Sequence, residues 1–325
     1  MNAPDSATIT ASVVVATYRR PDYVRTCLER LEAQTVSPQR TIVVDASPDH
    51  ETRAVVADFP AVEYRRNDHG AGTLATSRAI GISDLSEDVV AFIDDDAFAE
   101  PNWLEEILRP YRDAGVGAVG GRALNDQPGE EAQGIGQIGL LLPDGRLTGY
   151  FAADPGRDLD VHHMLGANMS VRLDAIRAVG GIHDFYPGTC LREDADIGLR
   201  IGRSGRRVVY APNAVVHHVG GTYAKGKRFD SRYRFYGARN HVVLLVTALG
   251  WGDPHVRRYL RTAARQVSHE IGTGLRSLRD PKRVGIRAKL RGLAGGFRRG
   301  AIDVVGTVAG IAAAIAAAAS LRRTR

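Results

Sequence analysis

The chain has 325 residues, of which 44% are hydrophobic and 25% charged, as in an ordinary globular protein with room for one large domain or a domain with an appendage. Its two cysteines, Cys27 and Cys190, exclude a disulfide framework and a cysteine-based zinc site, and so few cysteines are most simply explained by a reducing compartment. Residues 1–18 contain no basic region followed by an apolar stretch, so we expect no signal peptide.

The charge is unevenly distributed along the chain. Residues 251–325 contain 16 Lys and Arg against 4 Asp and Glu, a net charge of +12. The whole chain contains 43 and 37, so residues 1–250 carry a net charge of −6. A basic tail on an acidic body indicates contact with an anionic surface, either membrane or nucleic acid, although a solvated helical face gives the same pattern. We therefore predict two regions, 1–250 and 251–325.

Apolar runs alternate with helical patterns through the first 120 residues. The β-branched run 12–16 predicts a buried strand, and Pro21 suits the first turn of a helix over 21–34. Further strands are predicted at 41–47, 62–67, 88–93 and 116–121, and further helices at 71–83 and 101–113. This alternation predicts an α/β fold with a mostly parallel sheet. Ligands bind beyond the carboxyl ends of such strands, where Asp45 and Asp94 to Asp96 lie.

The second half of the body is less regular. Residues 125–165 are rich in Gly, Pro and Asp, and we expect loops over the sheet. A strand and a short helix are predicted within 162–181, a helix over 192–205, and one or two strands within 206–221. The region after Gly250 is predicted to be helical and basic.

Three consecutive carboxylates, Asp94, Asp95 and Asp96, follow the apolar run at 88–93. Like charges repel, and each costs free energy to desolvate, so a positive group is expected beside them. A divalent cation would offset them and could bridge them to nucleotide phosphates. The N-terminus of the following helix is an alternative partner, because its dipole favours anions. The triplet alone leaves both interpretations open.

An acid pair and a histidine pair follow further along the chain. Glu193 and Asp194 open a predicted helix, where acids usually cap, and His217 and His218 end a predicted strand. Each pair alone is unspecific, and paired histidines are more often surface residues than ligands. Their order is informative: an acid after the second strand, the triplet after the fourth, the acid pair, and then histidine.

This order resembles the inverting glycosyltransferases of family 2, which have a GT-A fold. The resemblance covers about residues 10–240 and rests on the stretches VVVATYRRPDYVRTCLERLEAQ, TIVVDASPD, AGTLATSRAIGI, AFIDDDAF, GANMSVR, LREDADIGLRI and VVHH. It implies a GT-A-like catalytic domain over 1–250 with a basic helical region over 251–325.

The resemblance also implies site residues. The triplet matches the DXD motif of the family, and Asp194 matches the acid of its ED motif, the catalytic base. The residues that would hold or face the nucleotide are Thr17, Tyr18, Arg19, Asp45, Arg78, Asp94 and Asp95. Asp96 would bind the metal, and His217 would complete its site; we prefer His217 to His218 because it directly follows the run AVV.

The implied reaction moves a sugar from a nucleotide-diphosphate sugar to a glycan, lipid-linked or small-molecule acceptor. A cation on Asp96 would neutralise charge on the diphosphate, and an imidazole ligand favours Mn²⁺ over Mg²⁺. Asp194 would take the proton of the acceptor hydroxyl. The segment GANMS would line the acceptor pocket, with Gly166 allowing close approach. Arg239 and Asn240 match a family Arg-Asn pair, which lies near the diphosphate or packs; we favour packing.

Other classes of function remain open at this stage. A nucleotidyltransferase acting on sugar phosphates shares the layout, but usually has a Gly-rich loop with a basic residue after the first strand, where this chain has ATYRRPD. A phosphotransferase with an aspartyl nucleophile would carry its DXD after the first strand. A non-catalytic nucleotide-sugar-binding module is the third alternative, and intact Asp96, Asp194 and His217 disfavour it.

The tail combines basic and apolar residues. Residues 255–280 predict a basic amphipathic helix with an apolar stripe that runs through Val256, Leu260, Ala263, Val267, Ile271 and Leu275. Membrane contact and packing on the body explain it equally well. Residues 301–320 are long enough to span a bilayer, but Asp303 and the many alanines favour a peripheral or packed helix. We expect a cytoplasmic enzyme, peripheral at the inner face of an anionic membrane, with no nucleic-acid partner and with oligomer formation left open.

Overall fold

The computed structural model describes residues 9–220 and 230–323. Within this part, the chain forms two compact units. The first, the sheet unit, comprises residues 9–141, 147–184 and 193–220. The second, the helical unit, comprises 142–146, 185–192 and 230–323. The division therefore differs from the predicted boundary at residue 250, because the helix after residue 230 groups with the helices of the tail.

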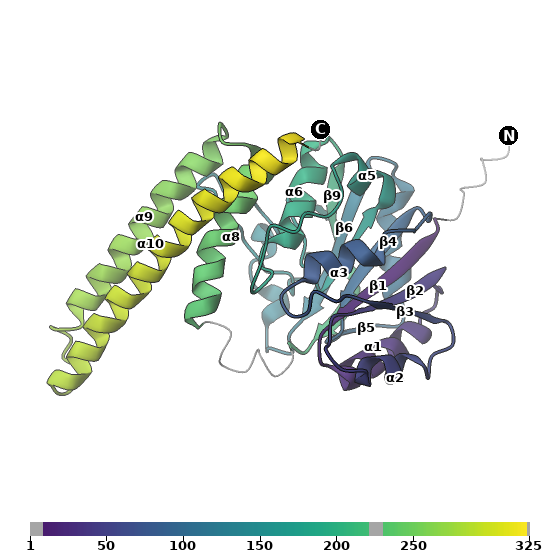
Figure 1. Cartoon of the computed structure of the whole chain (residues 1–325), viewed down its shortest axis with the longest axis horizontal. Helices are drawn as coiled ribbons and strands as arrows, with labels where there is room; N and C mark the ends of the chain where they lie inside the picture. The colour runs from purple at the N-terminus through teal and green to yellow at the C-terminus, as the bar shows by residue number, and fades with distance from the viewer. Residues whose placement is uncertain (1–8, 221–229, 324–325) are drawn as a thin grey trace. The chain divides into compact units, whose positions relative to one another are not determined.

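A single mixed sheet of nine described strands forms the centre of the sheet unit (Figure 1). The strands are β1 (Ala11–Thr17), β2 (Arg40–Asp45), β3 (Val62–Arg66), β4 (Val89–Asp94), β5 (Ala97–Ala99), β6 (Val116–Leu124), β7 (Leu159–Asp160), β8 (Asn168–Arg172) and β9 (Arg207–His218). Their order is β3-β2-β1-β4-β8-β6-β9-β5, with β7 beside β9. The first four strands are parallel, whereas β8 runs antiparallel to both of its neighbours.

Alternating side chains of the central strands build two cores, one on each face of the sheet. Val13 and Val15 of β1 face one core, and Val14 faces the other. Because successive side chains of a strand point to opposite faces, a strand covered on both faces must be apolar throughout, as SVVVA is. The expectation of a buried α/β sheet is confirmed.

Helices cover both faces of this sheet. They are α1 (Pro21–Glu32), α2 (Glu51–Val56), α3 (Leu74–Gly81), α4 (Trp103–Leu108), α5 (Leu173–Ala178) and α6 (Glu193–Arg203), with 3₁₀ turns at Arg109–Arg112, Glu130–Ala132 and Ile135–Gln137. Helix α1 begins at Pro21 and buries Val24, Cys27 and Leu28 in the core on the Val13 side. Helix α6 buries Ile197 and Ile201 in the other core.

The strand register brings the predicted strand-end residues together. Thr17 pairs with Asp45, and Ala16 pairs with Asp94, so β1, β2 and β4 end at one edge of the sheet. The final residue of β9, His218, pairs with Ala97 of β5. Ala97 directly follows the carboxylate triplet, whose last two residues form the turn between β4 and β5. The sheet therefore gathers groups from four separate stretches of sequence.

The helical unit contains α8 (Ser231–Leu249), α9 (Pro254–Arg276) and α10 (Ile286–Arg323). Helix α10 packs on the other two through a face of small residues. Side chains at Gly296, Gly306 and Gly310 would lie within 3 Å of the backbone carbonyl oxygens of Glu270, Phe235 and Arg239. Glycine at these positions allows the helix backbones to approach closely, which explains why the alanine- and glycine-rich tail forms a packed helix.

Charged residues are paired inside the helical unit. The carboxylate of Asp303 on α10 accepts two hydrogen bonds from Arg234 of α8, at 2.6 and 2.5 Å. Arg234 also donates to Glu270 of α9, which accepts from Arg299 as well. Asp303 is buried, so it does not interrupt the exposed face of α10.

Between Arg298 and Arg322, the exposed face of α10, here called its outer face, carries no charge. It consists of Ala301, Val304, Val305, Val308, Ala312, Ile315, Ala316, Ala319 and Ser320. By length and composition, α10 could cross a membrane, and within residues 9–220 and 230–323 it is the one helix that could. This criterion alone does not distinguish a membrane helix from a packed one.

Candidate active site

The carboxylate triplet lies in the turn between β4 and β5. Asp95 and Asp96 are buried, and Asp94 is half-buried. Two arginines and one histidine face these side chains. Three adjacent carboxylates are therefore offset by side chains of the protein itself, and each carboxylate has a different set of partners.

Arg20 supplies the positive charge nearest to two of the three carboxylates. Its Nη1 atom lies 2.9 Å from Asp95 Oδ1 and 2.8 Å from Asp96 Oδ2. The Thr17 hydroxyl donates a second hydrogen bond to Asp95, at 2.7 Å. Sequence reasoning missed Arg20 and selected its neighbour. Arg19 is exposed, and its guanidinium lies 5.6 Å from the ring centre of Tyr18.

The three carboxyl groups differ in pKa because their surroundings differ. Burial raises the pKa of Asp95 to about 7, although Arg20 and the Thr17 hydroxyl oppose the shift. Burial also raises the pKa of Asp94 in spite of Arg78. The pKa of Asp96 is lowered, because His218 and Arg20 together outweigh the effect of burial. Asp96 is thus the member of the triplet whose pKa its surroundings lower.

His218, and not His217, faces the triplet. Its Nε2 atom lies 3.4 Å from Asp96 Oδ1. One ligand atom from each of Asp94, Asp96 and His218 lies within 4.8 Å of the other two. His217 instead contacts Glu100 at 2.7 Å and Asp126 at 3.3 Å. The geometry therefore favours His218 over the predicted His217 as the candidate metal ligand, because adjacent residues of a strand point to opposite faces.

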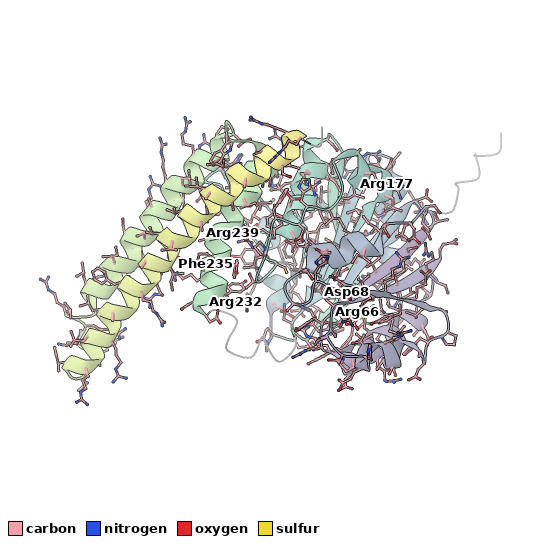
Figure 2. The ribbon with its side chains drawn as sticks, viewed as in Figure 1. Arg66, Asp68, Arg177, Arg232, Phe235 and Arg239 are labelled. Carbon is pink, nitrogen blue, oxygen red and sulfur yellow. The ribbon has the colours of Figure 1, made fainter. Side chains whose placement is uncertain are left out.

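Asp45 lies fully buried at the end of β2. Its Oδ1 accepts a hydrogen bond from the backbone N–H of Ser47, and its Oδ2 accepts one from the hydroxyl of Tyr64, at 2.8 and 2.9 Å. Arg66, which ends β3 and is labelled in Figure 2, lies 3.9 Å from the same carboxylate by its Nη1 atom. Asp45 pairs with Thr17 at the same strand edge, and Tyr18, whose ring is exposed, directly follows Thr17 in the chain.

Arg78 of α3 is buried beneath the triplet and links three elements. It forms an ion pair with Glu193 at the start of α6, and its Nη2 atom lies 3.2 Å from Asp94. The same atom donates to the carbonyl oxygen of Gly166 at 2.7 Å. Burial raises the pKa of Glu193 to about 8, against the effect of the Arg78 charge. Glu193 had no assigned role in the sequence analysis.

Asp194 contacts the other side of the same peptide segment. Its Oδ2 accepts the backbone N–H of Gly166 at 3.0 Å, and its Oδ1 accepts that of Ala195 at 2.7 Å. A Cβ atom at Gly166 would lie 2.9 Å from Arg78 Nη2, so a side chain there would push the guanidinium away. A continuous set of contacts therefore joins Asp94, Arg78, Gly166 and Asp194.

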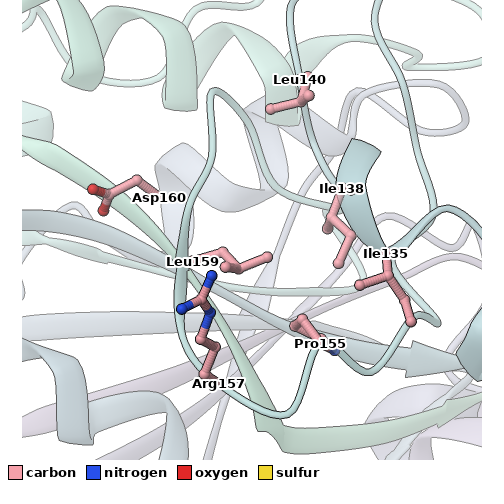
Figure 3. A pocket seen from close by; sticks show the side chains of 8 residues that line it. Ile135, Ile138, Leu140, Pro155, Arg157, Leu159 and Asp160 are labelled. Carbon is pink, nitrogen blue, oxygen red and sulfur yellow. The ribbon is translucent and has the colours of Figure 1, made fainter.

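A separate cavity of about 320 Å³ lies elsewhere in the sheet unit (Figure 3). It is lined mainly by apolar side chains, with Arg157 and Asp160 at its edge. The lining residue Leu159 pairs with Tyr210, eight residues before His218 on β9. None of the residues that line the cavity belongs to the triplet or to its partners Arg20, Arg78 and His218. The cavity is not part of the candidate active site.

Comparison with known families identifies the class of this protein. The model for Glycosyl transferase family 2 matches residues 12–180, just over half of the chain. The model for Glycosyl transferase family group 2 matches residues 149–270. The chain belongs to glycosyl transferase family 2 and is a glycosyltransferase. This membership decides against the nucleotidyltransferase, phosphotransferase and non-catalytic alternatives.

Individual relatives agree with this assignment. The chain is 30% identical over 220 residues to the glucosyl-dolichyl phosphate glucuronosyltransferase of Haloferax volcanii, covering 64% of this chain and 68% of that protein. It is 27% identical to the O-antigen chain rhamnosyltransferase WbaN of Salmonella anatum, covering 58% of each chain. It is 26% identical to the succinoglycan biosynthesis protein ExoM of Rhizobium meliloti, covering 74% and 76%.

A solved structure has the same fold. The mannosyltransferase PcManGT from Pyrobaculum calidifontis, in complex with GDP-Man and Mn²⁺, matches with a TM-score of 0.60 at 16% identity. The match covers 95% of this chain and 89% of that chain. The expected GT-A fold is confirmed.

Proposed function

We propose that this glycosyltransferase moves a sugar from a nucleotide-diphosphate sugar to an acceptor hydroxyl, with inversion at the anomeric carbon and with the help of a divalent cation. One observation carries the proposal: contacts through Arg78 and Gly166 join the acid cluster at the end of β4 to Asp194 at the start of α6. The acid cluster, which can bind a cation for the leaving diphosphate, and Asp194, which can accept a proton, are thus linked by direct contacts.

The residues at the strand ends fit a divalent cation. Asp94, Asp96 and His218 offer two carboxylates and one imidazole within a small volume, and Asp96 is held ionised, as a metal ligand must be. Imidazole favours Mn²⁺ over Mg²⁺, whose ligands are usually all oxygen. When bound, the cation would supply positive charge against the diphosphate leaving group. The Mn²⁺ in the mannosyltransferase structure supports this assignment.

Asp194 is the proposed general base. The N–H groups of Gly166 and Ala195 fix its carboxylate, which leaves the remaining lone pairs of both oxygens for an acceptor hydroxyl. The hydroxyl proton passes to Asp194 while the hydroxyl oxygen bonds to the anomeric carbon. The bond from that carbon to the phosphate oxygen breaks, and the nucleoside diphosphate leaves. Attack opposite to the leaving group inverts the configuration.

The ends of β1, β2 and β4 form the proposed donor site. Thr17, Tyr18 and Arg19, at the end of β1, would hold the nucleotide together with Asp45. Asp94 and Asp95 would face the nucleotide and its ribose. Tyr18 offers an exposed ring, and Asp45 is a buried acceptor. Arg20 joins this set, because it is the cation nearest to the triplet. Arg78 acts from beneath, by holding Asp94 and Gly166 in place.

We further propose that the helical unit rests on an anionic membrane at its cytoplasmic face. The outer face of α10 is apolar over Ala301 to Ala319, which is about 27 Å at 1.5 Å per residue and close to the roughly 30 Å of a hydrocarbon core. Arg298 precedes this face on α10, and Arg322 and Arg323 follow it. Helix α9 of the same unit carries further exposed basic residues, Arg257, Arg258, Arg261, Arg265 and Arg276. A lipid-linked acceptor suits this placement, as the name of the Haloferax relative supports.

A screen of donors tests the proposed reaction. The purified protein is incubated with UDP, dTDP and GDP sugars, with Mn²⁺ or with EDTA, and release of nucleoside diphosphate is measured. One donor should be hydrolysed slowly with Mn²⁺ and not with EDTA. NMR of a product formed with an added acceptor should then show inverted anomeric configuration. Turnover that is insensitive to EDTA, or a product with retained configuration, would contradict the proposal.

A further inference from the structure

A short segment, Phe185–Arg192, connects the helical unit to the proposed catalytic base. It lies in sequence between two stretches of the sheet unit, yet it belongs to the helical unit. Its last residue, Arg192, is joined by a peptide bond to Glu193, the first residue of α6, and Asp194 follows directly. Any constraint on this segment therefore reaches Asp194 through two peptide bonds.

Helix α8 holds the segment through Arg239 and Asn240. The Nδ2 atom of Asn240 donates a hydrogen bond to the carbonyl oxygen of Leu191 at 3.1 Å. The carbonyl oxygen of Pro187 lies 3.5 Å from the same Nδ2 atom. Arg239 donates to the carbonyl oxygen of Phe185 at 2.9 Å and to the side-chain oxygen of Asn240 at 2.7 Å. Arg239 extends from α8 in Figure 2. Asn240 is fully buried, so its amide hydrogen bonds have no competition from water.

The backbone of the segment is strained. Two residues other than glycine, Cys190 and Arg192, have positive φ angles of 55° and 84°. Such conformations are unfavourable for residues other than glycine and persist only where the surroundings impose them. Gly188 has a φ of 81°, and a Cβ atom there would overlap the ring of Tyr236 on α8. The segment therefore takes its path because α8 holds it, and not because its sequence prefers that path.

We infer that Asn240, supported by Arg239, is a positioning residue for Asp194. By fixing the carbonyl groups of Pro187 and Leu191, it sets where α6 begins and hence where the proposed base stands. This inference rests on the proposed role of Asp194. It gives the helical unit a role in the reaction itself, besides its proposed membrane contact.

The Asn240→Asp variant tests the inference in the full-length enzyme, because it keeps the shape of the side chain but removes the two N–H donors. We expect kcat to fall by about 10²-fold, the order of loss that a 1 Å displacement of a catalytic group can cause. The Kd for nucleoside diphosphate with Mn²⁺ should stay unchanged, because the strand ends are untouched.

His241→Ala is the matched control. His241 is also buried on α8 and hydrogen-bonds a backbone carbonyl, that of Gly145 at 2.7 Å, but the segment 142–146 does not lead into Asp194. We expect this variant to lower the melting temperature and to leave kcat nearly intact. Arg239→Gln, which removes the contact with Phe185 at a less buried position, should lower kcat in the same direction even if Asn240→Asp folds poorly.

Asp194→Asn is measured in parallel to separate the two proposals. If Asp194→Asn lowers kcat while Asn240→Asp and Arg239→Gln leave kcat unchanged, the positioning role is wrong. The role is also wrong if His241→Ala lowers kcat as much as Asn240→Asp at equal loss of stability. If Asp194→Asn itself leaves kcat unchanged, the assignment of the base fails, and the positioning role fails with it.

Discussion

The carboxylate of Asp194 accepts the backbone N–H of Gly166 at 3.0 Å, while the carbonyl oxygen of the same glycine accepts Arg78. This arrangement fixes the proposed base and allows a direct test. Asp194→Asn keeps the shape but removes the proton acceptor, so turnover should fall by about 10²–10⁴-fold, the usual contribution of acid–base catalysis. Nucleoside diphosphate affinity, measured by calorimetry, should be unchanged. Normal turnover would remove Asp194 from the mechanism.

Gly166→Ala should weaken both the site and the fold. The added Cβ would lie 2.9 Å from Arg78 Nη2, and this guanidinium is buried and held by Glu193 and Asp94, so it has little room to move. Overpacking of this kind costs about 1–3 kcal/mol of unfolding free energy. Urea unfolding measures that cost, and steady-state kinetics should show a lower kcat. Gly149→Ala is the control, because nothing lies within 4 Å of the added atom. It should leave the unfolding free energy and kcat unchanged.

Acid sensitivity should depend on Asp196, a buried residue of α6. Burial raises its pKa, but Arg200 and His183 more than offset this, and the net pKa in the folded state is lowered. Arg200 Nη2 lies 2.6 Å from Asp196, and His183 lies 3.4 Å away. A depressed folded pKa adds stability that is fully present above the unfolded value of about 3.9 and is lost as pH falls through the folded value.

Unfolding free energy measured between pH 7 and pH 3 checks this expectation. Asp196→Asn leaves Arg200 buried without its charged partner, which should cost about 3–5 kcal/mol at neutral pH. The variant should also lose less stability than the wild type as the pH drops below about 4. Asp174→Asn, which removes an exposed partner of Arg206, is the control and should follow the wild-type curve. Parallel pH curves for wild type and Asp196→Asn would contradict the assignment.

Membrane binding should depend on both charge and the outer face of α10. Each basic residue near an anionic leaflet contributes about 1 kcal/mol, and salt screens this attraction beyond roughly 8 Å at physiological ionic strength. The full-length protein should therefore bind anionic vesicles at low salt, and more weakly as salt rises. Val305→Asp with Val308→Asp places charges on the outer face and should weaken binding at every salt concentration.

Val36→Asp is the matched control for vesicle binding, because Val36 is an exposed valine of the sheet unit. It should bind as the wild type does. A full-length protein that ignores anionic vesicles at low salt would show that the arginines of the tail serve another purpose. If the double variant Val305→Asp, Val308→Asp binds vesicles as well as the wild type, the outer face of α10 does not contact lipid.

Much of the fold could be predicted from local sequence. The strand SVVVA is apolar throughout, so it has to be covered on both faces. Predicted strands alternate with helices such as 21–34, and this alternation leaves few alternatives to a parallel arrangement of the first four strands. In a parallel arrangement the carboxyl ends of the strands lie at one edge, so Thr17, Asp45 and Asp94 were expected there. The strand register confirms this. The antiparallel direction of β8 could not be predicted, because a short apolar run has the same pattern whichever way the strand runs in the sheet.

The finer geometry could not be predicted from local patterns. Arg19 takes a φ of 55° at the end of β1, which turns the chain so that Arg20 reaches the triplet. His217 and His218 follow an irregularity in β9. The adjacent residues Gly121 and Arg122 of β6 pair with Ala211 and Val215 of β9, so three residues of β9 are left out of the pairing. Alternation counted from the start of that strand therefore fails at its end. Asp303 argued against a membrane-spanning helix over residues 301–320, and its partner Arg234, 69 residues away, could not be identified from the sequence.

The central claim, that the cluster at the ends of β4 and β9 binds a divalent cation, is tested most directly by titrating Mn²⁺ and following the free ion by electron paramagnetic resonance. Nucleoside diphosphate is present, and the wild type is compared with Asp96→Asn, His218→Ala and His217→Ala. We predict that Asp96→Asn and His218→Ala lose most of the binding and that His217→Ala, the adjacent histidine facing Glu100, keeps it. Wild-type Mn²⁺ affinity in Asp96→Asn and His218→Ala, or loss of binding confined to His217→Ala, would contradict the account.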